Sequence, residues 1–160
     1  MKITILCVGK IKEKFYTDAI HEYIKRLSRY CKLDIVQVAD EKTPDNASPA
    51  MERQIKDREG ERLMKYLANS SAYKIVLAID GKMMDSVELS KHFHEQMLAG
   101  CSELIFVIGG SLGLSEEVLS CADLKLSFSK MTFPHQLMRV ILLEQIYRSY
   151  RIMNHEPYHK

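Results

Sequence analysis

Apolar and polar positions along this chain follow two alternating periods, one typical of strands and the other of helices. Short apolar runs predict strands at residues 2–8, 32–38, 73–79, 103–108 and 124–128. Helical spacing and helix-end signals predict helices at residues 11–30, 50–67, 86–98, a short one opened by Ser115, and a last one at 134–153. This alternation predicts an α/β fold, a mostly parallel sheet with helices on both faces.

Local signals fix the expected ends of several elements. Pro49 suits a first helical position, and Asp85 with Glu88 has the spacing of a capping box. Asp80-Gly81 is a turn dipeptide, which predicts that the third strand stops at Ile79. The last two strands each open into a loop and then a helix. Their loops are therefore expected side by side at the carboxyl edge of the sheet, where open α/β sheets bind ligands.

Length and composition predict a single domain over residues 1–160. The chain is 46% hydrophobic and 28% charged, which is typical of a globular protein. No apolar stretch is long enough to cross a bilayer, and residues 1–10 lack a signal-peptide pattern. The four cysteines form no C-x-x-C pair, which favours free thiols in a reducing compartment. We therefore expect a cytoplasmic protein with no membrane partner.

Positive charge is concentrated toward the C-terminus. Residues 125–160 hold six Lys or Arg and two acidic residues, whereas residues 1–124 hold 17 basic and 19 acidic ones. This asymmetry is a modest indication of a nucleic-acid or phosphate partner. An ordinary solvated helix explains the charge alone equally well.

Two loops are the main candidates for a ligand site. Gly109-Gly110-x-x-Gly113 follows a strand, where glycines either let the backbone approach a ligand or simply make a tight turn. The loop matches neither the dinucleotide fingerprint nor the P-loop. In residues 127–134, polar and apolar side chains alternate, so this loop can wrap an aromatic ring or plug the core. Its pattern alone favours core packing.

The last helix and the histidines bear on assembly and on metals. Apolar residues cover more of this helix than a single stripe, which predicts a homodimer that buries a second side of it. The alternative is a central helix enclosed by its own chain. His92 and His94 point in different directions on a helix, and His155 and His159 lack further ligands. We therefore expect no metal site.

Five segments together resemble the ribosomal RNA large subunit methyltransferase H family, of the SPOUT class. They are VGKIKEKF at 8–15, LAIDGK at 77–82, FVIGGSLGL at 106–114, LSFSKMTFPHQLMRVILLEQIYR at 126–148 and EPYHK at 156–160. Their order and spacing match over essentially the whole chain. The resemblance implies an α/β fold with a C-terminal trefoil knot, which periodicity cannot reveal.

The same resemblance implies a homodimer that binds S-adenosyl-L-methionine in its knot loops. The positions implied to line this cofactor are Leu77, Gly109, Gly110, Phe128, Ser129, Lys130, Met131, Thr132 and Phe133. The family's reaction methylates N3 of a pseudouridine in 23S ribosomal RNA on the assembled 70S ribosome. N3 must lose its proton, and the candidates to assist this step or hold the base are His135, Arg148, Tyr158 and His159.

For RNA recognition, we expect phosphates to contact Arg139, Arg148, Arg151 and Lys160, and Tyr158 to stack on or orient the target base. His135 also suits a purely structural role at a helix start. We expect the C-terminal tail to become ordered only on the substrate, in an arrangement that can cross the dimer interface. Two other functions stay open: a non-catalytic ribosome-binding module, and a small-molecule nucleotide enzyme that uses the 109–113 loop.

Overall fold

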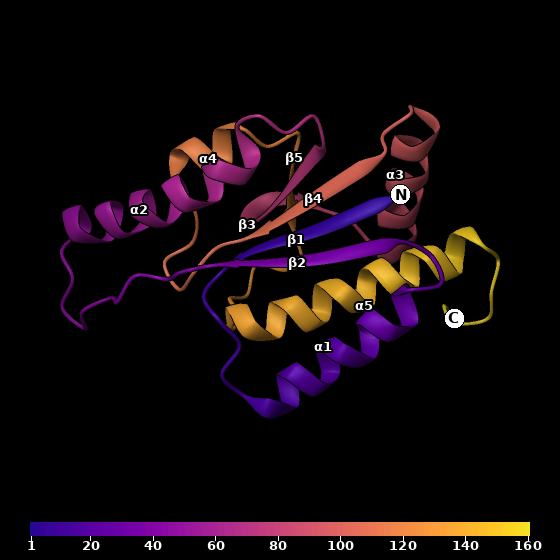
Figure 1. Ribbon diagram of the computed structural model, residues 1–160, viewed down its shortest axis with the longest axis horizontal. Helices are drawn as coiled ribbons and strands as arrows, with labels where there is room; N and C mark the ends of the chain where they lie inside the picture. Colours follow the sequence, from indigo (N-terminus) through magenta and orange to yellow (C-terminus); the bar gives the residue numbers. More distant parts are fainter.

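The computed structural model describes residues 1–160 and confirms the α/β fold. Strands and helices alternate along the chain (Figure 1) in the order β1 Lys2–Val8, α1 Lys14–Leu27, β2 Lys32–Val38, α2 Pro49–Leu67, β3 Tyr73–Met83, α3 Ser86–Leu98, β4 Glu103–Ile108, α4 Glu116–Ser120, β5 Leu124–Ser127 and α5 His135–Met153. The strands form one parallel sheet in the order β2-β1-β4-β3-β5. No helix has the length and apolar character that a membrane span requires. The trefoil knot stays a prediction.

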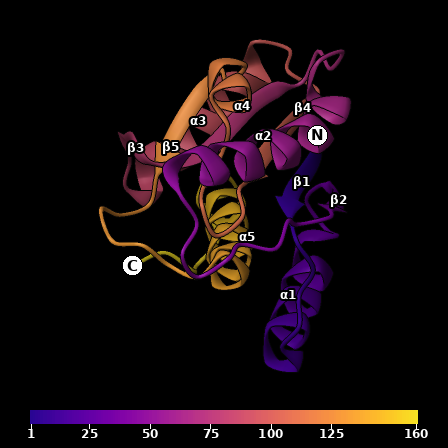
Figure 2. The same cartoon turned by 90° about the vertical axis from the view of Figure 1, so that its left-hand side faces the viewer.

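Helices cover both faces of the sheet, as the alternation predicts. Helices α1, α3 and α5 lie on one face, and α2 and α4 lie on the other (Figures 1 and 2). The strands read as continuous apolar runs because both of their faces are buried. Five residues of β4, for example, are at most 4% exposed, and Ile3 and Ile5 of β1 are fully buried. The sheet therefore separates two apolar cores and leaves its carboxyl edge for a site.

The predicted helix ends are largely confirmed. The Asp85 carboxylate accepts a hydrogen bond from the Glu88 N–H at 2.7 Å, and the Glu88 carboxylate accepts one from the Asp85 N–H at 2.8 Å, so the capping box is complete. Pro49 occupies the first turn of α2 behind Ser48. Helix α1 is shorter than the periodicity predicts, because it begins at Lys14 rather than at residue 11.

The expected stop of the third strand at Asp80-Gly81 is wrong. Strand β3 continues to Met83, with an irregularity between Leu77 and Lys82 in its pairing with β5. A Cβ atom at Gly81 would lie 2.7 Å from the backbone carbonyl of Lys125. Gly81 is therefore needed where this irregular stretch of β3 passes close to the backbone of β5.

The broad apolar surface of α5 is mostly used within the chain. Helix α5 packs between α1 and α3, and Leu142, Leu143 and Ile146 are fully buried. The alternative of a helix enclosed by its own chain thus explains most of the pattern, and the breadth of this surface no longer argues for a dimer. Leu137 and Ile141 are half-buried and belong to neither core, so one narrow strip of the helix is only partly covered.

Candidate functional site

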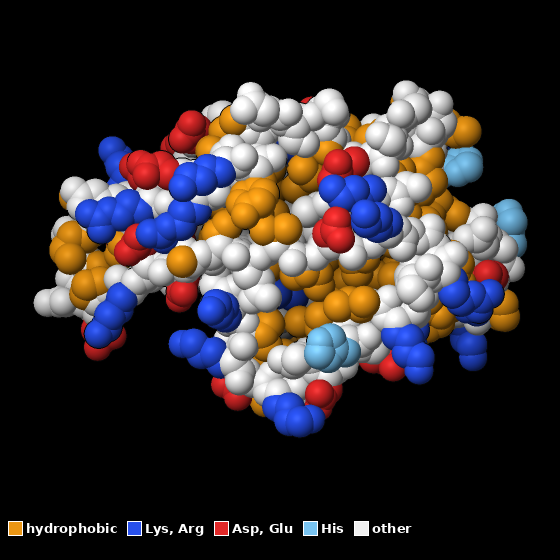
Figure 3. Space-filling view, viewed as in Figure 1, with side chains coloured by type: hydrophobic (Ala, Val, Ile, Leu, Met, Phe, Trp, Pro, Cys, Tyr) orange, Lys and Arg blue, Asp and Glu red, His pale blue; other side chains and the backbone are white.

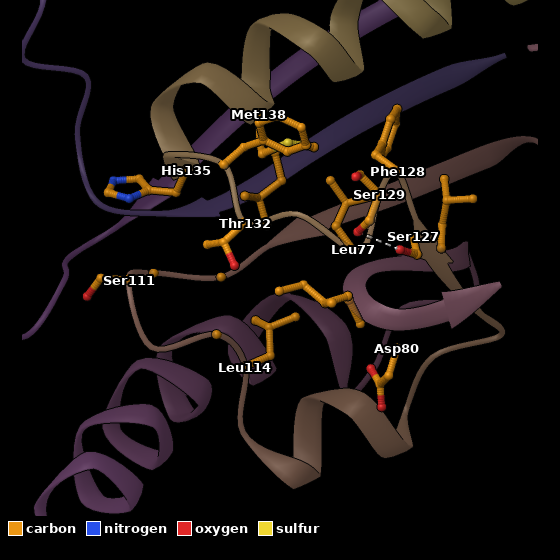
Figure 4. Close-up of a pocket in the computed structure, with 18 of the residues that line it drawn as sticks. Leu77, Asp80, Ser111, Leu114, Ser127, Phe128, Ser129, Thr132, His135 and Met138 are labelled. Atoms are coloured by element: carbon orange, nitrogen blue, oxygen red, sulfur yellow. Dashed lines mark hydrogen bonds between the residues drawn. The ribbon is translucent and has the colours of Figure 1, made fainter. Parts of the chain in front are cut away.

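A cavity of about 690 Å³ lies at the carboxyl edge of the sheet, where β4 and β5 end (Figure 4). Its walls come mainly from residues 77–80, 108–114, 126–129 and 131–135, so the two loops that follow β4 and β5 do lie side by side. Eight of the nine positions expected to line a cofactor line this cavity: Leu77, Gly109, Gly110, Phe128, Ser129, Met131, Thr132 and Phe133. The volume is in the range of small-molecule sites.

Lys130 is the exception among these nine positions. Its side chain is exposed and lies outside the cavity lining, so the prediction that it lines the pocket is wrong. The loop conformation explains this. The Ser127 hydroxyl donates to the Ser129 carbonyl at 3.1 Å, and the Met131 N–H donates to the Ser129 hydroxyl at 3.0 Å. These bonds curl the backbone around Ser129, which breaks the simple inward and outward alternation.

The glycine loop is both a tight turn and a cavity wall. The Gly113 N–H donates to the Gly110 carbonyl at 3.1 Å, and Gly113 has a φ of +88°. A Cβ atom at Gly109 would lie 2.8 Å from the carbonyl group of Gly113. The tight turn and the close approach to a ligand, which the sequence left as alternatives, are therefore compatible, because the turn places bare backbone against the cavity.

Helix α2 supports the glycine loop from behind, through residues that sequence reasoning missed. A Cβ atom at Gly110 would lie 2.9 Å from Glu59 Oε2, and a Cβ atom at Gly60 would lie 2.3 Å from the Ser115 hydroxyl. Glu59 is only 4% exposed, and burial raises the pKa of its carboxyl group. The available signal was Gly60 itself, since a glycine inside a helix usually serves close packing.

His135 closes one end of the cavity. Its side chain points from the start of α5 toward the connection that follows β1 (Figure 4). Burial, and then the charge of Arg139, lower the pKa of the His135 imidazole below its ordinary value. The ring is therefore neutral at pH 7 and can accept a hydrogen bond or a proton.

We expect His135 to make the folded state less stable in acid. Because its folded-state pKa lies below the unfolded-state value, the unfolded chain binds the extra proton, and stability falls as pH decreases through about 6.5. His92, whose pKa burial also lowers, contributes in the same direction. In urea titrations at a series of pH values, His135→Gln should flatten this fall, and adding His92→Gln should flatten it further. An unchanged pH dependence in His135→Gln would contradict the burial of a neutral ring.

Arg139 is not available to bind RNA. It is 1% exposed, and its guanidinium group donates to the carbonyl oxygens of Val8 at 2.8 Å and Gly9 at 2.7 Å. The expectation that Arg139 contacts phosphate is therefore wrong in this structure. Its role is to join α5 to the end of β1.

We expect Arg139→Ala to destabilise the fold by about 2 kcal/mol, because two buried carbonyl groups lose their donor. Equilibrium unfolding in urea measures the effect. The matched control is Arg53→Ala, at an exposed position of α2 outside any ion pair, where the change should stay within about 0.5 kcal/mol. Equal losses in the two variants would show that Arg139 is not a structural brace.

The other candidate catalytic residues form a second cluster at the far end of α5. Glu144, which sequence reasoning missed, accepts hydrogen bonds from the Arg148 guanidinium group at 2.5 Å and from the Tyr158 hydroxyl at 3.1 Å. Arg148 also stacks 4.7 Å from the Tyr158 ring centre and lies 3.4 Å from His159 Nδ1. Burial, and then Glu144, raise the pKa of Tyr158 to about 12. Its phenol therefore stays protonated and acts as a donor.

The C-terminal tail has a defined fold in this structure, and its ordering on the substrate stays a prediction. It folds back along α5, with the Tyr158 ring edge-on against Tyr147 at 5.0 Å between ring centres. Arg151 forms an ion pair with Glu156 at 2.9 Å, so this arginine is engaged in holding the tail. Lys160 is exposed and free to contact phosphate.

Within one chain, the two candidate clusters lie apart. His135 begins α5 and Arg148 lies near its end, which separates them by about 20 Å along the helix axis. A nucleotide held at the His135 end of the cavity is therefore far from Arg148 of the same chain. The two clusters would both reach one nucleotide if the tail came from another copy of the chain.

Comparisons with known proteins agree with these features. A family model described as predicted SPOUT methyltransferase matches residues 1–159. Proteins called ribosomal RNA large subunit methyltransferase H from Bifidobacterium adolescentis and Clostridium kluyveri are 60% and 58% identical to this chain, over 100% of both chains in each case. A Legionella pneumophila methyltransferase solved with bound S-adenosylmethionine aligns with a TM-score of 0.52 at 10% identity, covering 94% of this chain and 66% of that one. The last likeness concerns the fold alone.

Proposed function

Because the chain belongs to the ribosomal RNA large subunit methyltransferase H family of SPOUT methyltransferases, we propose that it transfers a methyl group from S-adenosylmethionine to 23S ribosomal RNA in the cytoplasm. The target we propose is N3 of a pseudouridine on the assembled 70S ribosome. The observation that supports this best is the cavity, which unites the two loops that the family resemblance assigns to the cofactor.

The cavity residues fit this cofactor. Apolar side chains from three elements can enclose an adenine ring, among them Leu77, Phe128 and Phe133. The glycine loop offers bare backbone, which suits the polar ends of the ligand. When bound, S-adenosylmethionine supplies an electrophilic methyl group attached to a sulfonium sulfur.

The chain's own contribution to the reaction is mainly orientation. A methyl transfer needs the nucleophile in line with the bond that breaks, and a closed cavity edge fixes this geometry and excludes water. His135, neutral at one end of the cavity, is positioned to hold or accept the N3 proton. Tyr158 and Arg148 would position the base and its phosphates rather than act as bases, since both keep their protons.

We propose a homodimer in which the tail of one subunit completes the cavity of the other. The separation of the two clusters within one chain supports this arrangement. The partly covered strip of α5 with Leu137 and Ile141, which lies between the two clusters, also supports it. Ile79 and Met131, at the cavity, are also exposed, by 55% and 73%. Apolar side chains of this kind are typical of a surface that a partner covers.

Transfer of labelled methyl from S-adenosylmethionine to unmodified 70S ribosomes, with mapping of the product nucleotide, tests the proposal. We expect incorporation at N3 of one pseudouridine and little on naked 23S RNA, because so small a protein has too little surface to read sequence extensively. Cofactor binding without incorporation would point to another RNA substrate. Absence of both would favour the non-catalytic ribosome-binding module, and transfer to free nucleotides would favour the small-molecule enzyme.

A further inference from the structure

The connection between β1 and α1 carries two lysines with no partner in the chain. Lys10 and Lys12 are exposed and form no ion pair, whereas Lys14, one turn further on, is paired with Asp18 at 2.6 Å. The excess of basic residues along the sequence lies at residues 125–160, so it does not single out Lys10 and Lys12. Figure 3 shows lysine and arginine side chains over this connection, beside the hollow under the segment that joins β2 to α2.

This connection lies next to the cavity. The Lys12 N–H donates to the Gln136 side chain at 3.0 Å, which ties the connection to the first turn of α5. The neighbouring residue in α5 is His135, which lines the cavity. A Cβ atom at Gly9, in the same connection, would lie 3.6 Å from His135 Nε2, so the connection borders the cavity end. Figure 4 shows His135 pointing toward the same connection.

The connection is also held rigidly from below. Arg139, which is buried, donates to the carbonyl groups of Val8 and Gly9. Gly9 has a φ of +83°, and its N–H donates to the Val38 carbonyl at 2.8 Å. Burying a guanidinium group is costly, and Arg139 offsets part of this cost by donating to these two carbonyl groups, which fixes the backbone at the start of the connection. A backbone that is already fixed loses little entropy when it binds a ligand, so this arrangement favours binding by the connection.

We propose that Lys10 and Lys12 form a phosphate-binding rim that holds the RNA backbone beside the nucleotide in the cavity. Flexible ammonium groups bind phosphate without reading sequence, so the rim would fix the register of the RNA strand. The carboxylate of Asp40 lies near the same turn, 3.6 Å from where a Gly9 Cβ would be, and limits the net attraction. The proposal rests on the proposed function, because it assumes an RNA substrate.

The test compares two variants with equal loss of charge. The rim variant is Lys10→Gln with Lys12→Gln, and the control is Lys65→Gln with Lys91→Gln, at exposed positions of α2 and α3. Binding to a ribosomal RNA stem-loop and to 70S ribosomes is measured over a series of salt concentrations. We expect the rim variant to bind about tenfold more weakly and its salt slope to fall by about 1 to 2, while the control stays close to wild type.

Three further readouts make the result decisive. Lys10→Arg with Lys12→Arg should restore the salt slope, and the Kd for S-adenosylmethionine and the Tm should be unchanged in the rim variant. If the rim and control variants lose affinity equally, the effect is one of net charge and the rim is wrong. The proposed rim is also wrong if the wild type binds RNA and the rim variant has the same salt dependence of binding as the wild type. If the wild type binds no RNA, the proposed function fails and the rim falls with it.

Discussion

Replacing Gly109 by alanine is expected to weaken S-adenosylmethionine binding at least about a hundredfold, which corresponds to roughly 3 kcal/mol. A Cβ atom there would lie 2.8 Å from the carbonyl group of Gly113 and 3.0 Å from Leu114 Cγ. The first contact involves backbone, so no side-chain rotation relieves it. The turn closed by the Gly113 N–H must open, and with it the cavity wall that Leu114 helps to form.

Isothermal titration calorimetry with S-adenosylmethionine and a thermal unfolding curve separate a damaged cavity from a damaged fold. The control is Gly100→Ala, which meets no atom within 4 Å but has a φ of +85°. It should cost about 1 kcal/mol of stability through backbone strain and leave the Kd unchanged. Gly113→Ala, also in open space with a positive φ, should give an intermediate loss. A wild-type Kd in Gly109→Ala would mean that the cofactor does not use this loop.

Local signals in the sequence were enough for most of the fold, because the relevant interactions are local. The Asp85 capping box and the Ser115 N-cap depend on residues within one turn, and both are present. The pairing of the two loops followed from strand direction alone, since parallel strands end at one edge. Gly81 shows the limit. Whether a glycine makes a turn or a close approach depends on a neighbouring strand, here the backbone of Lys125, which lies far away in sequence.

The errors at the site have similar causes. Arg139 was counted as a surface charge, although it shares a helix face with Leu142, Leu143 and Ile146, and helical periodicity could have revealed its burial. Glu144 could not be singled out, because its role depends on Tyr158 folding back from the tail. The distance between His135 and Arg148 follows from helix length, but only once both are known to lie in one straight helix.

Mixing two inactive variants is expected to restore activity if the cavity and the tail of different subunits form one site. Gly109→Ala damages the cavity and leaves the tail intact, whereas Tyr158→Ala removes the stacking ring on Arg148 and leaves the cavity intact. Alone, Tyr158→Ala should lower methyl transfer about a hundredfold or more through lost orientation of the base, with an unchanged Kd for S-adenosylmethionine. That separation of turnover from cofactor binding identifies the tail as a substrate-positioning element.

When the two variants are unfolded together in equal amounts and refolded, half of the dimers contain one subunit of each kind. Each mixed dimer has two sites, and one of them combines an undamaged cavity with an undamaged tail. The mixture should therefore recover about one quarter of wild-type activity. A site contained within one chain would give no recovery, because every chain then carries a lesion.

The double variant Gly109→Ala with Tyr158→Ala, mixed with wild type, is the matched control. In trans, its mixed dimers contain no intact site, so about one quarter of the activity remains, whereas a site in cis would retain about one half. A site shared between subunits therefore gives more activity than a site within one chain in the first mixture and less in the second. A general loss of activity on refolding cannot produce both results.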